Sequence, residues 1–185
     1  MNPLHIVCLG SSAGGLEALI VFFKRMAPTS GKAFVVIQHL RADHPTLTPE
    51  ILSRITAMPV TEAKEGETVV ANHVYTIPPN TRMTIARDRL HLAPRTETPG
   101  IHKPFDRFLE SLAINSHANA TAVVLSGYDG DGSIGFIAIK ANGGITYAQD
   151  WTALVDEMPK HALATGCVDH VLDPGKIAER IALAA

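Results

Sequence analysis

Ser12 stands at the centre of a Gly-x-Ser-x-Gly motif that runs from Gly10 to Gly14. An apolar run at 6–9 precedes the motif and a helical pattern of apolar residues follows it, which predicts a strand, a tight turn and a helix. Small flanking residues let a serine sit on such a turn with its hydroxyl exposed above a sheet, as in a nucleophile elbow. The helix that begins there directs free backbone N–H groups and its positive dipole end toward the same place. The motif therefore favours a nucleophilic serine with donors ready for an oxyanion.

A nucleotide-binding turn is the alternative interpretation of this stretch, because glycine-rich turns between a strand and a helix also bind phosphate groups. A dinucleotide site would show Gly-x-Gly-x-x-Gly and an acidic residue near the end of the next strand. Here the sequence from Gly10 to Gly15 reads Gly-Ser-Ser-Ala-Gly-Gly, and the next apolar run ends in Gln38 and His39. Both features count against a dinucleotide cofactor.

Polar residues also follow two other apolar runs. His39 follows the run 33–38, and the loop Gly127–Gly132, which contains Asp129 and Asp131, follows the run 121–126. The carboxyl ends of parallel strands meet at one edge of a sheet, so these side chains are expected to converge near the serine. A histidine can take the serine proton, and an acid behind it can orient the imidazole. The sequence predicts a hydrolytic triad that acts on an acyl compound.

The same residues allow other interpretations. His39 could be a structural histidine, or it could join Asp43 and His44 in a metal cluster, although no spacing here matches a common zinc motif. Asp129 and Asp131 could be turn residues or ligands of Mg²⁺. The coincidence of serine, histidine and aspartate at three strand ends favours the triad, and neither a metal nor a cofactor is expected.

The elements that must position these residues alternate between strand and helix. Continuous apolar runs predict buried strands, and apolar residues three and four apart predict helices. Strands are expected at 6–9, 33–38, 121–126, 144–149 and 168–172, and helices at 16–26, 48–55, 104–116, 134–141, 158–165 and 174–183. Short β segments between 58 and 94 are separated by turn residues, and part of this region is expected to form antiparallel hairpins attached to the main sheet. The pattern predicts an α/β fold, doubly wound, with a mostly parallel sheet, helices on both faces and a small antiparallel hairpin region.

Length and composition predict a single domain over residues 1–185. The chain has 185 residues, of which 46% are hydrophobic and 18% charged, enough for one well-developed core. The formal net charge of -2 gives no basic patch to suggest nucleic acid. The sequence contains no signal peptide and no apolar run of membrane-spanning length, so a cytoplasmic protein without membrane insertion is expected.

Motifs spread over essentially the whole chain carry a family resemblance. They are Gly10–Gly15, Gln38–His39, Val74–Asn80, Pro104–Asp106, Leu125–Gly132, Ala148–Asp150 and Met158–Ala162. Together they resemble the CheB family of protein-glutamate methylesterases from bacterial chemotaxis. The Ser-Ala-Gly-Gly-Leu-Glu-Ala-Leu form that starts at Ser12 most resembles the esterase portion of proteins that fuse it to a CheR-type methyltransferase.

By this resemblance, Ser12 is the nucleophile, His39 the base and Asp131 the orienting acid. The free N–H groups of the turn make Ala13 a candidate oxyanion contact, and the family adds a contact near Tyr128, where many members carry methionine. The implied reaction hydrolyses glutamate 5-methyl esters on chemoreceptor cytoplasmic helices to glutamate and methanol, and some members also deamidate glutamine. The implied partners are methylated receptor helices and a CheR-type methyltransferase or other signalling domain in the same full-length protein. The esterase pattern uses the whole sequence, so no receiver domain is expected within it.

Two functions from other classes are the alternatives. One is a catalytically degenerate module that binds receptor helices within a larger signalling protein, against which the intact serine, histidine and aspartate argue. The other is a nucleotide-binding domain built on the Gly14–Gly15 turn, which a nucleotide titration would test. Basic residues in predicted loops are expected to help to hold a partly acidic partner; they are Arg41, Arg95 and Lys103.

Overall fold

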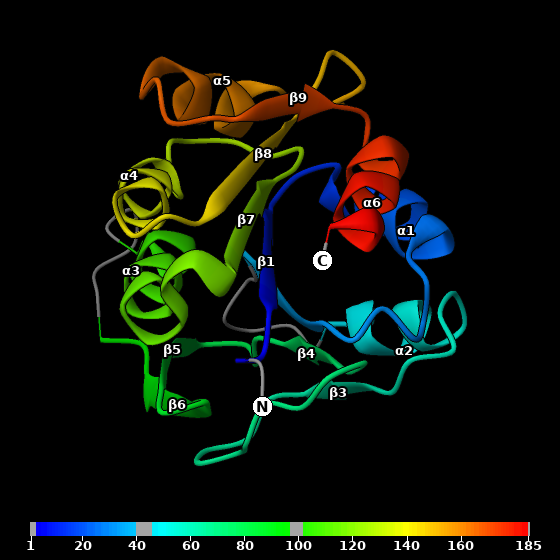
Figure 1. The fold of residues 1–185 in the computed structure, drawn as a ribbon, viewed down its shortest axis with the longest axis vertical. Helices are drawn as coiled ribbons and strands as arrows, with labels where there is room; N and C mark the ends of the chain where they lie inside the picture. Colours follow the sequence, from blue (N-terminus) through cyan, green and yellow to red (C-terminus); the bar gives the residue numbers. More distant parts are fainter. Residues whose placement is uncertain (1–2, 40–45, 97–101, 185) are drawn as a thin grey trace.

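A seven-stranded sheet forms the centre of the protein (Figure 1). The computed structural model describes residues 3–39, 46–96 and 102–184. The strands lie in the order β3-β4-β2-β1-β7-β8-β9, and every neighbouring pair is parallel. Their bounds are β1 Ile6–Ser11, β2 Ala33–Gln38, β3 Val60–Glu62, β4 Val74–Thr76, β7 Ala120–Val124, β8 Ile145–Gln149 and β9 His170–Leu172. The chain adds β2 on one side of β1 and β7 on the other, and such a reversal marks where sites form beyond the carboxyl ends of strands.

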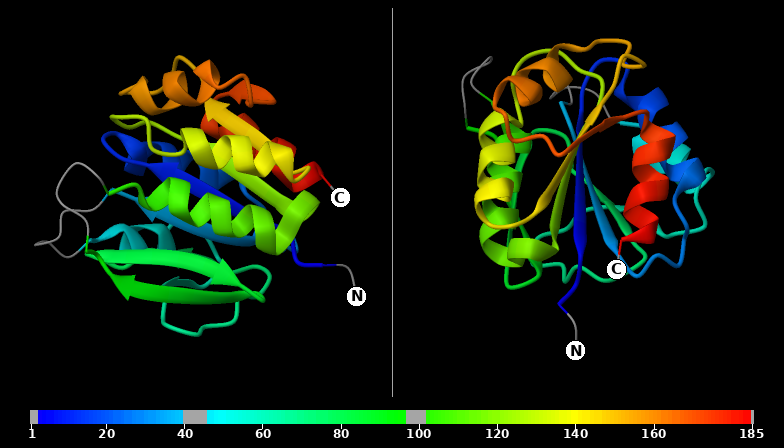
Figure 2. Two further views of the ribbon diagram at one scale, coloured as in Figure 1. Left: turned by 90° about the vertical axis from the view of Figure 1, so that its left-hand side faces the viewer. Right: turned by 45° about the horizontal axis from the view of Figure 1, so that its top comes forward.

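Helices cover both faces of this sheet, as the turned views show (Figure 2). Helices α1 (Gly15–Arg25), α2 (Thr48–Ser53) and α6 (Pro174–Leu183) pack on one face. Helices α3 (Pro104–Ser116), α4 (Ser133–Ala141) and α5 (Glu157–Ala164) pack on the other, and a short 3-10 turn, His117–Asn119, follows α3. Among the described residues, no helix combines the length and the apolar character needed to cross a membrane.

Alternate side chains of β1 enter two separate cores. Ile6 and Cys8 are buried in the core beneath α3, α4 and α5, whereas Val7 and Leu9 are buried in the core beneath α1, α2 and α6. A strand that is apolar on both faces has to be covered on both faces, which is why its sequence reads as a continuous apolar run. The predicted α/β fold, doubly wound with helices on both faces and a small antiparallel hairpin, is confirmed.

The hairpin region differs from the prediction in one respect. β5 (Thr81–Ala86) and β6 (Arg89–Pro94) pair in antiparallel fashion but form a two-stranded sheet of their own. The hairpin packs on α3, where the Ile85 N–H donates to Ser111 Oγ at 3.0 Å. Attachment of this hairpin to the main sheet is therefore wrong for the described residues.

The other short strands of this region join the main sheet. β4 pairs in parallel with β2, and β3 pairs in parallel with β4. The segment 68–70, which was also expected to be a strand, contributes an isolated bridge between Thr68 and Arg89. The direction of a short strand depends on a partner that is distant in the chain, so local alternation could not distinguish these pairings.

Candidate active site

The turn that carries Ser12 is tied to two neighbouring strands. Residues Ser11 of β1 and Gln38 of β2 are paired in the parallel register, so Ser12 and His39 occupy the next positions on adjacent strands. The His39 N–H donates to the Ser11 carbonyl at 3.2 Å, and the Ser12 N–H donates to the carbonyl of Ser126, after β7, at 2.9 Å. The serine turn and the histidine are thus held by backbone hydrogen bonds at the same edge of the sheet.

His39 and Asp131 are hydrogen-bonded to each other. The distance between His39 Nε2 and Asp131 Oδ2 is 2.6 Å, and the aspartate is 1% exposed. The backbone N–H groups of Phe105 and Asp106 also donate to the Asp131 carboxylate, at 2.9 and 2.8 Å. Because these two groups belong to the first turn of α3, the positive end of that helix stabilises the Asp131 anion and fixes its orientation.

Asp129 has a different place beside the same histidine. Its Oδ2 lies 3.6 Å from His39 Nδ1, which is too long for a hydrogen bond, and its Oδ1 lies 3.3 Å from Lys103 Nζ. Its side chain is about half exposed and its φ is 71°. Oδ1 also accepts the Asp131 N–H at 2.6 Å, so Asp129 shapes the loop that presents Asp131.

The serine hydroxyl has not engaged the histidine in this structure. Among the described residues, no hydrogen bond joins Ser12 Oγ to His39, although their backbones are neighbours. The N–H groups of Ala13 and Tyr128 also have no protein acceptor within the described ranges. Tyr128 is 56% exposed. Free backbone donors beside a serine turn are what an oxyanion site requires.

Two buried polar residues support the site, and sequence reasoning assigned them no role. The Ser126 hydroxyl donates to the Ala13 carbonyl at 2.7 Å and accepts the Val155 N–H at 2.9 Å, so it joins the serine turn to the loop after β8. The Asp106 carboxylate accepts the Gly135 N–H at 2.8 Å and thereby joins α3 to α4. Ser126 belongs to the motif Leu125–Gly132, and Asp106 belongs to the motif Pro104–Asp106. In the sequence, a polar residue next to apolar residues of a helix or a strand end was the feature that could have indicated a structural role for each.

Burial raises the pKa of two groups near the site, the Asp106 carboxyl and the Cys8 thiol. Burial, and after it the charge of Asp131, raise the pKa of Asp106 to about 6. Burial, with a smaller contribution from Asp131, also raises the pKa of the Cys8 thiol well above its usual value. Cys8 therefore stays a neutral thiol and behaves as a small core residue.

Some predicted residues fall outside the described ranges. Asp43 and His44, which formed the metal alternative with His39, are among them, and so is Arg41. Within 3–39, 46–96 and 102–184, no group of three or more His, Cys, Asp or Glu side chains could hold a metal ion. Of the other basic candidates, Lys103 pairs with Asp129, and the Arg95 backbone N–H donates to the Asn80 carbonyl.

The fold and this geometry define an α/β protein with a serine turn, a histidine and a buried aspartate at neighbouring strand ends. A family profile described as CheB methylesterase matches residues 7–181. The crystal structure of the Thermotoga maritima CheB methylesterase catalytic domain superimposes with a TM-score of 0.89, at 27% identity, and the match covers 97% of each chain. The chain belongs to the CheB methylesterase family, which confirms the resemblance found in its motifs.

Curated relatives carry the corresponding names. A protein-glutamate methylesterase/protein-glutamine glutaminase 2 from Xanthomonas oryzae pv. oryzae (strain MAFF 311018) is 37% identical over 182 residues, 96% of this chain and 51% of the relative. A protein-glutamate methylesterase/protein-glutamine glutaminase from Yersinia pestis bv. Antiqua (strain Antiqua) is 30% identical over 189 residues, 98% of this chain and 53% of the relative. The chain thus spans about half the length of the curated relatives that it matches.

Proposed function

We propose that this chain is a serine hydrolase that converts glutamate 5-methyl esters on chemoreceptor helices to glutamate and methanol. The observation that carries the proposal is the 2.6 Å hydrogen bond between His39 and the buried Asp131, one strand away from the Ser12 turn. An acid, a histidine and a serine in this order are the parts of a hydrolytic triad. Membership in the family and the names of the relatives support the ester as the substrate.

In this mechanism the two nitrogens of His39 have different tasks. Asp131 accepts the Nε2 proton, so Nδ1 carries the free lone pair and is the base. Nδ1 takes the Ser12 Oγ proton as Oγ attacks the ester carbonyl, and the oxyanion is met by the Ala13 N–H, with the Tyr128 N–H as the second candidate donor. The C–O bond to the methoxy group then breaks, and the imidazolium gives its proton to the departing methanol.

A water molecule completes the reaction. Nδ1 of His39 takes a proton from this water, which attacks the glutamyl–serine ester. The bond between the acyl carbon and Ser12 Oγ then breaks, and the imidazolium gives the proton that it took from the water to Ser12 Oγ. The product is a glutamate carboxylate. The same steps on a glutamine side chain release ammonia in place of methanol, which accounts for a second, glutaminase activity.

A CheR-type methyltransferase in the same full-length protein is the partner that fits this chemistry. The motif that begins at Ser12 resembles fusion proteins of this kind. A methyltransferase forms the ester that the present site removes, so the two activities would act in opposite directions on one substrate. Residues 1–185 would then be the single esterase domain of that protein.

The proposal is tested with a purified methylated receptor fragment and measurement of released methanol. Ser12→Ala should abolish turnover, and Asp131→Asn should lower kcat on the order of 10⁴-fold, by analogy with the triad acid of trypsin-like proteases. Ser53→Ala is the matched control, because that hydroxyl lies on α2 and bonds its own helix at Glu50. Labelling of Ser12 by a fluorophosphonate, read by mass spectrometry, tests the nucleophile directly. Methanol release by Ser12→Ala at the wild-type rate would contradict the proposal.

A further inference from the structure

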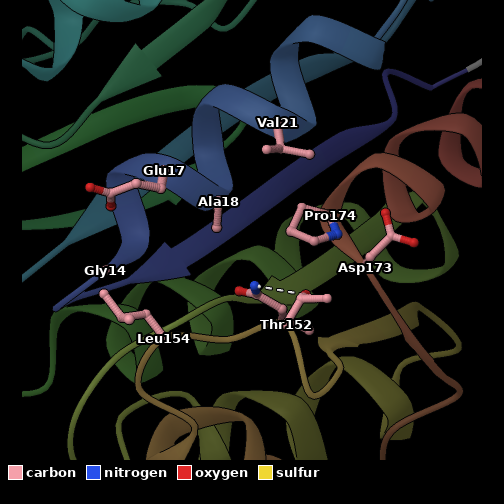
Figure 3. Close-up of a pocket in the computed structure, with 9 residues that line it drawn as sticks. Gly14, Glu17, Ala18, Val21, Thr152, Leu154, Asp173 and Pro174 are labelled. Atoms are coloured by element: carbon pink, nitrogen blue, oxygen red, sulfur yellow. Dashed lines mark hydrogen bonds between the residues drawn. The ribbon is translucent and has the colours of Figure 1, made fainter.

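A pocket adjoins the serine turn on the side of the sheet covered by α1 and α6 (Figure 3). Its volume is about 490 Å³, within the usual range for ligand sites. The lining includes Gly14, Ala18, Val21, Leu154 and Pro174, which come from the serine turn, from α1, from the loop after β8 and from the start of α6. None of the roles proposed above uses this pocket.

Leu154 is presented to solvent at one end of the pocket by a braced loop. Leu154 is 77% exposed, and Trp151, three residues earlier in the same loop, is 88% exposed. The next residue, Val155, donates its N–H to Ser126 Oγ and accepts the Gly127 N–H, both at 2.9 Å. The braced loop leaves most of the Leu154 and Trp151 surface open to water, uncovered by the residues that the structure describes. Exposed apolar surface of this kind marks an interaction site.

The pocket is continuous with the serine turn. Gly14 lines it, and a Cβ at Gly14 would lie 2.8 Å from the Leu154 Cβ, so the turn and the leucine are in close contact. Two Cα–Cα steps of 3.8 Å place Gly14 no more than about 7.6 Å from Ser12. One turn of an α-helix rises about 5.4 Å. A side chain one turn away from a glutamate that reacts at Ser12 can therefore reach the mouth of the pocket.

The charges around the pocket are acidic. Glu17 lies at the same end as Gly14 and Leu154, and Asp173 lies at the other end (Figure 3). Asp173 caps α6 and pairs with Lys176, whereas Glu17 is exposed and has no cationic partner in the part of the chain that the structure describes. A basic residue on the ligand would meet Glu17.

From these observations we propose that the pocket is a subsite for the protein substrate, where it takes an apolar side chain one helical turn from the reacting glutamate and a Lys or Arg beside it. This inference rests on the proposed function, since it names what the same site recognises next to the ester. The apolar side chain would be buried between α1 and Leu154, and the neighbouring Lys or Arg would pair with Glu17. These two contacts make the enzyme select for helices of this sequence.

Helical peptides of about 20 residues test the proposal, each with one glutamate 5-methyl ester. The residue four positions before or after the ester is Leu or Ser, and its neighbour is Lys or Glu. Wild type should cleave the Leu–Lys peptide of one orientation with a kcat/KM at least tenfold above that of its Ser–Lys counterpart, because a leucine leaves water only in the former. Val21→Asp and Leu154→Asp, both at exposed positions, should each remove most of this preference. Glu17→Lys should reverse the preference for Lys over Glu.

Ile114→Asp is the matched control, because Ile114 is 72% exposed on α3, on the opposite face of the sheet, and should leave the peptide preference intact. Equal rates on Leu and Ser peptides in both orientations, with Ser12-dependent turnover retained, would overturn the subsite and leave the proposed function standing. Absence of turnover on every peptide and on a small methyl ester would overturn both. Dimerisation of wild type that is lost in Leu154→Asp, without any peptide preference, would assign the surface to a second copy of the chain.

Discussion

Ionisation of Asp106 should weaken the fold. This carboxyl lies in the first turn of α3, is 6% exposed and accepts the Gly135 N–H at 2.8 Å. Burial raises its pKa most, the charge of Asp131 adds to the effect, and the result is a pKa of about 6 where 3.8 is usual. Asp106→Asn keeps the shape and the acceptor oxygen but removes the titration, so it isolates the contribution of this single proton.

The magnitude follows from the pKa difference between the folded and unfolded chain. One pKa unit corresponds to 1.36 kcal/mol, so a rise from 3.8 to about 6 amounts to about 3 kcal/mol. Because the folded-state pKa is the higher one, the stabilisation is fully present below about pH 4 and is lost as the pH rises through about 6. By about pH 8 the wild type should have lost about 3 kcal/mol that Asp106→Asn retains.

Urea unfolding of both proteins between about pH 3.5 and 8 measures this effect as a difference in the free energy of unfolding. The comparison of wild type with Asp106→Asn cancels the contribution of His5, which is the same in both proteins. Burial lowers the pKa of His5 to about 4, so this histidine makes the fold more stable as the pH rises from about 4 to 6.5, opposite to the effect of Asp106. Asp156→Asn, a charge removal at an exposed position, controls for the change in net charge. A difference that stays flat across the range would refute the reasoning, and one that favours wild type more at high pH would show that the ionised form is stabilised.

Two further substitutions test the packing around Ser12 and the capping of α6. Gly127→Ala should destabilise the protein by about 1–3 kcal/mol and reduce ester hydrolysis, because a Cβ there would lie 2.2 Å from Met158 Sδ and 2.9 Å from Ser12 Cβ. Gly130→Ala is its control, because a Cβ at Gly130 would have its nearest contact at 3.4 Å. An equal loss of stability in both variants would remove the steric explanation. Asp173→Ala should lower Tm by about 2–4 °C in a thermal melt, because it removes about 1 kcal/mol of capping of α6. Asp173→Ser should restore most of that loss, since a serine oxygen can accept the same N–H groups, and no recovery would mean that the cap is not the cause.

Local pattern predicted the elements that run through the core. The apolar runs at 33–38 and 121–126 correspond to β2 and β7, and the helical spacing at 104–116 corresponds to α3. These elements are long enough to show their periodicity, and burial on both faces makes the strands apolar throughout. The three-residue strands β3 and β4 are too short for that, and their parallel pairing depends on β2, which lies more than 20 residues before either.

The polar support of the site was less accessible from the sequence. Ser126 and Asp106 lie in motifs that were recognised, yet their work depends on partners in other elements: Ala13 and Val155 for the hydroxyl, and Gly135 for the carboxylate. A serine or an aspartate next to apolar residues indicates that a buried partner exists, but not which one. The catalytic roles of the strand-end residues stay predictions, whereas their placement at one edge of a parallel sheet followed from topology alone.

The choice between Asp129 and Asp131 shows where the missing information lies. Both acids stand in one glycine-rich loop within reach of His39, and nothing in that loop distinguishes them. A buried carboxylate is costly unless its oxygens accept hydrogen bonds. Asp131 meets this condition because α3 begins beside it and supplies two N–H groups from residues 25 and 26 positions earlier in the chain, whereas Asp129 stays at the surface with Lys103. The first turn of α3 therefore decides which acid is fixed against His39, so a change at that turn should alter the orientation of the imidazole through Asp131.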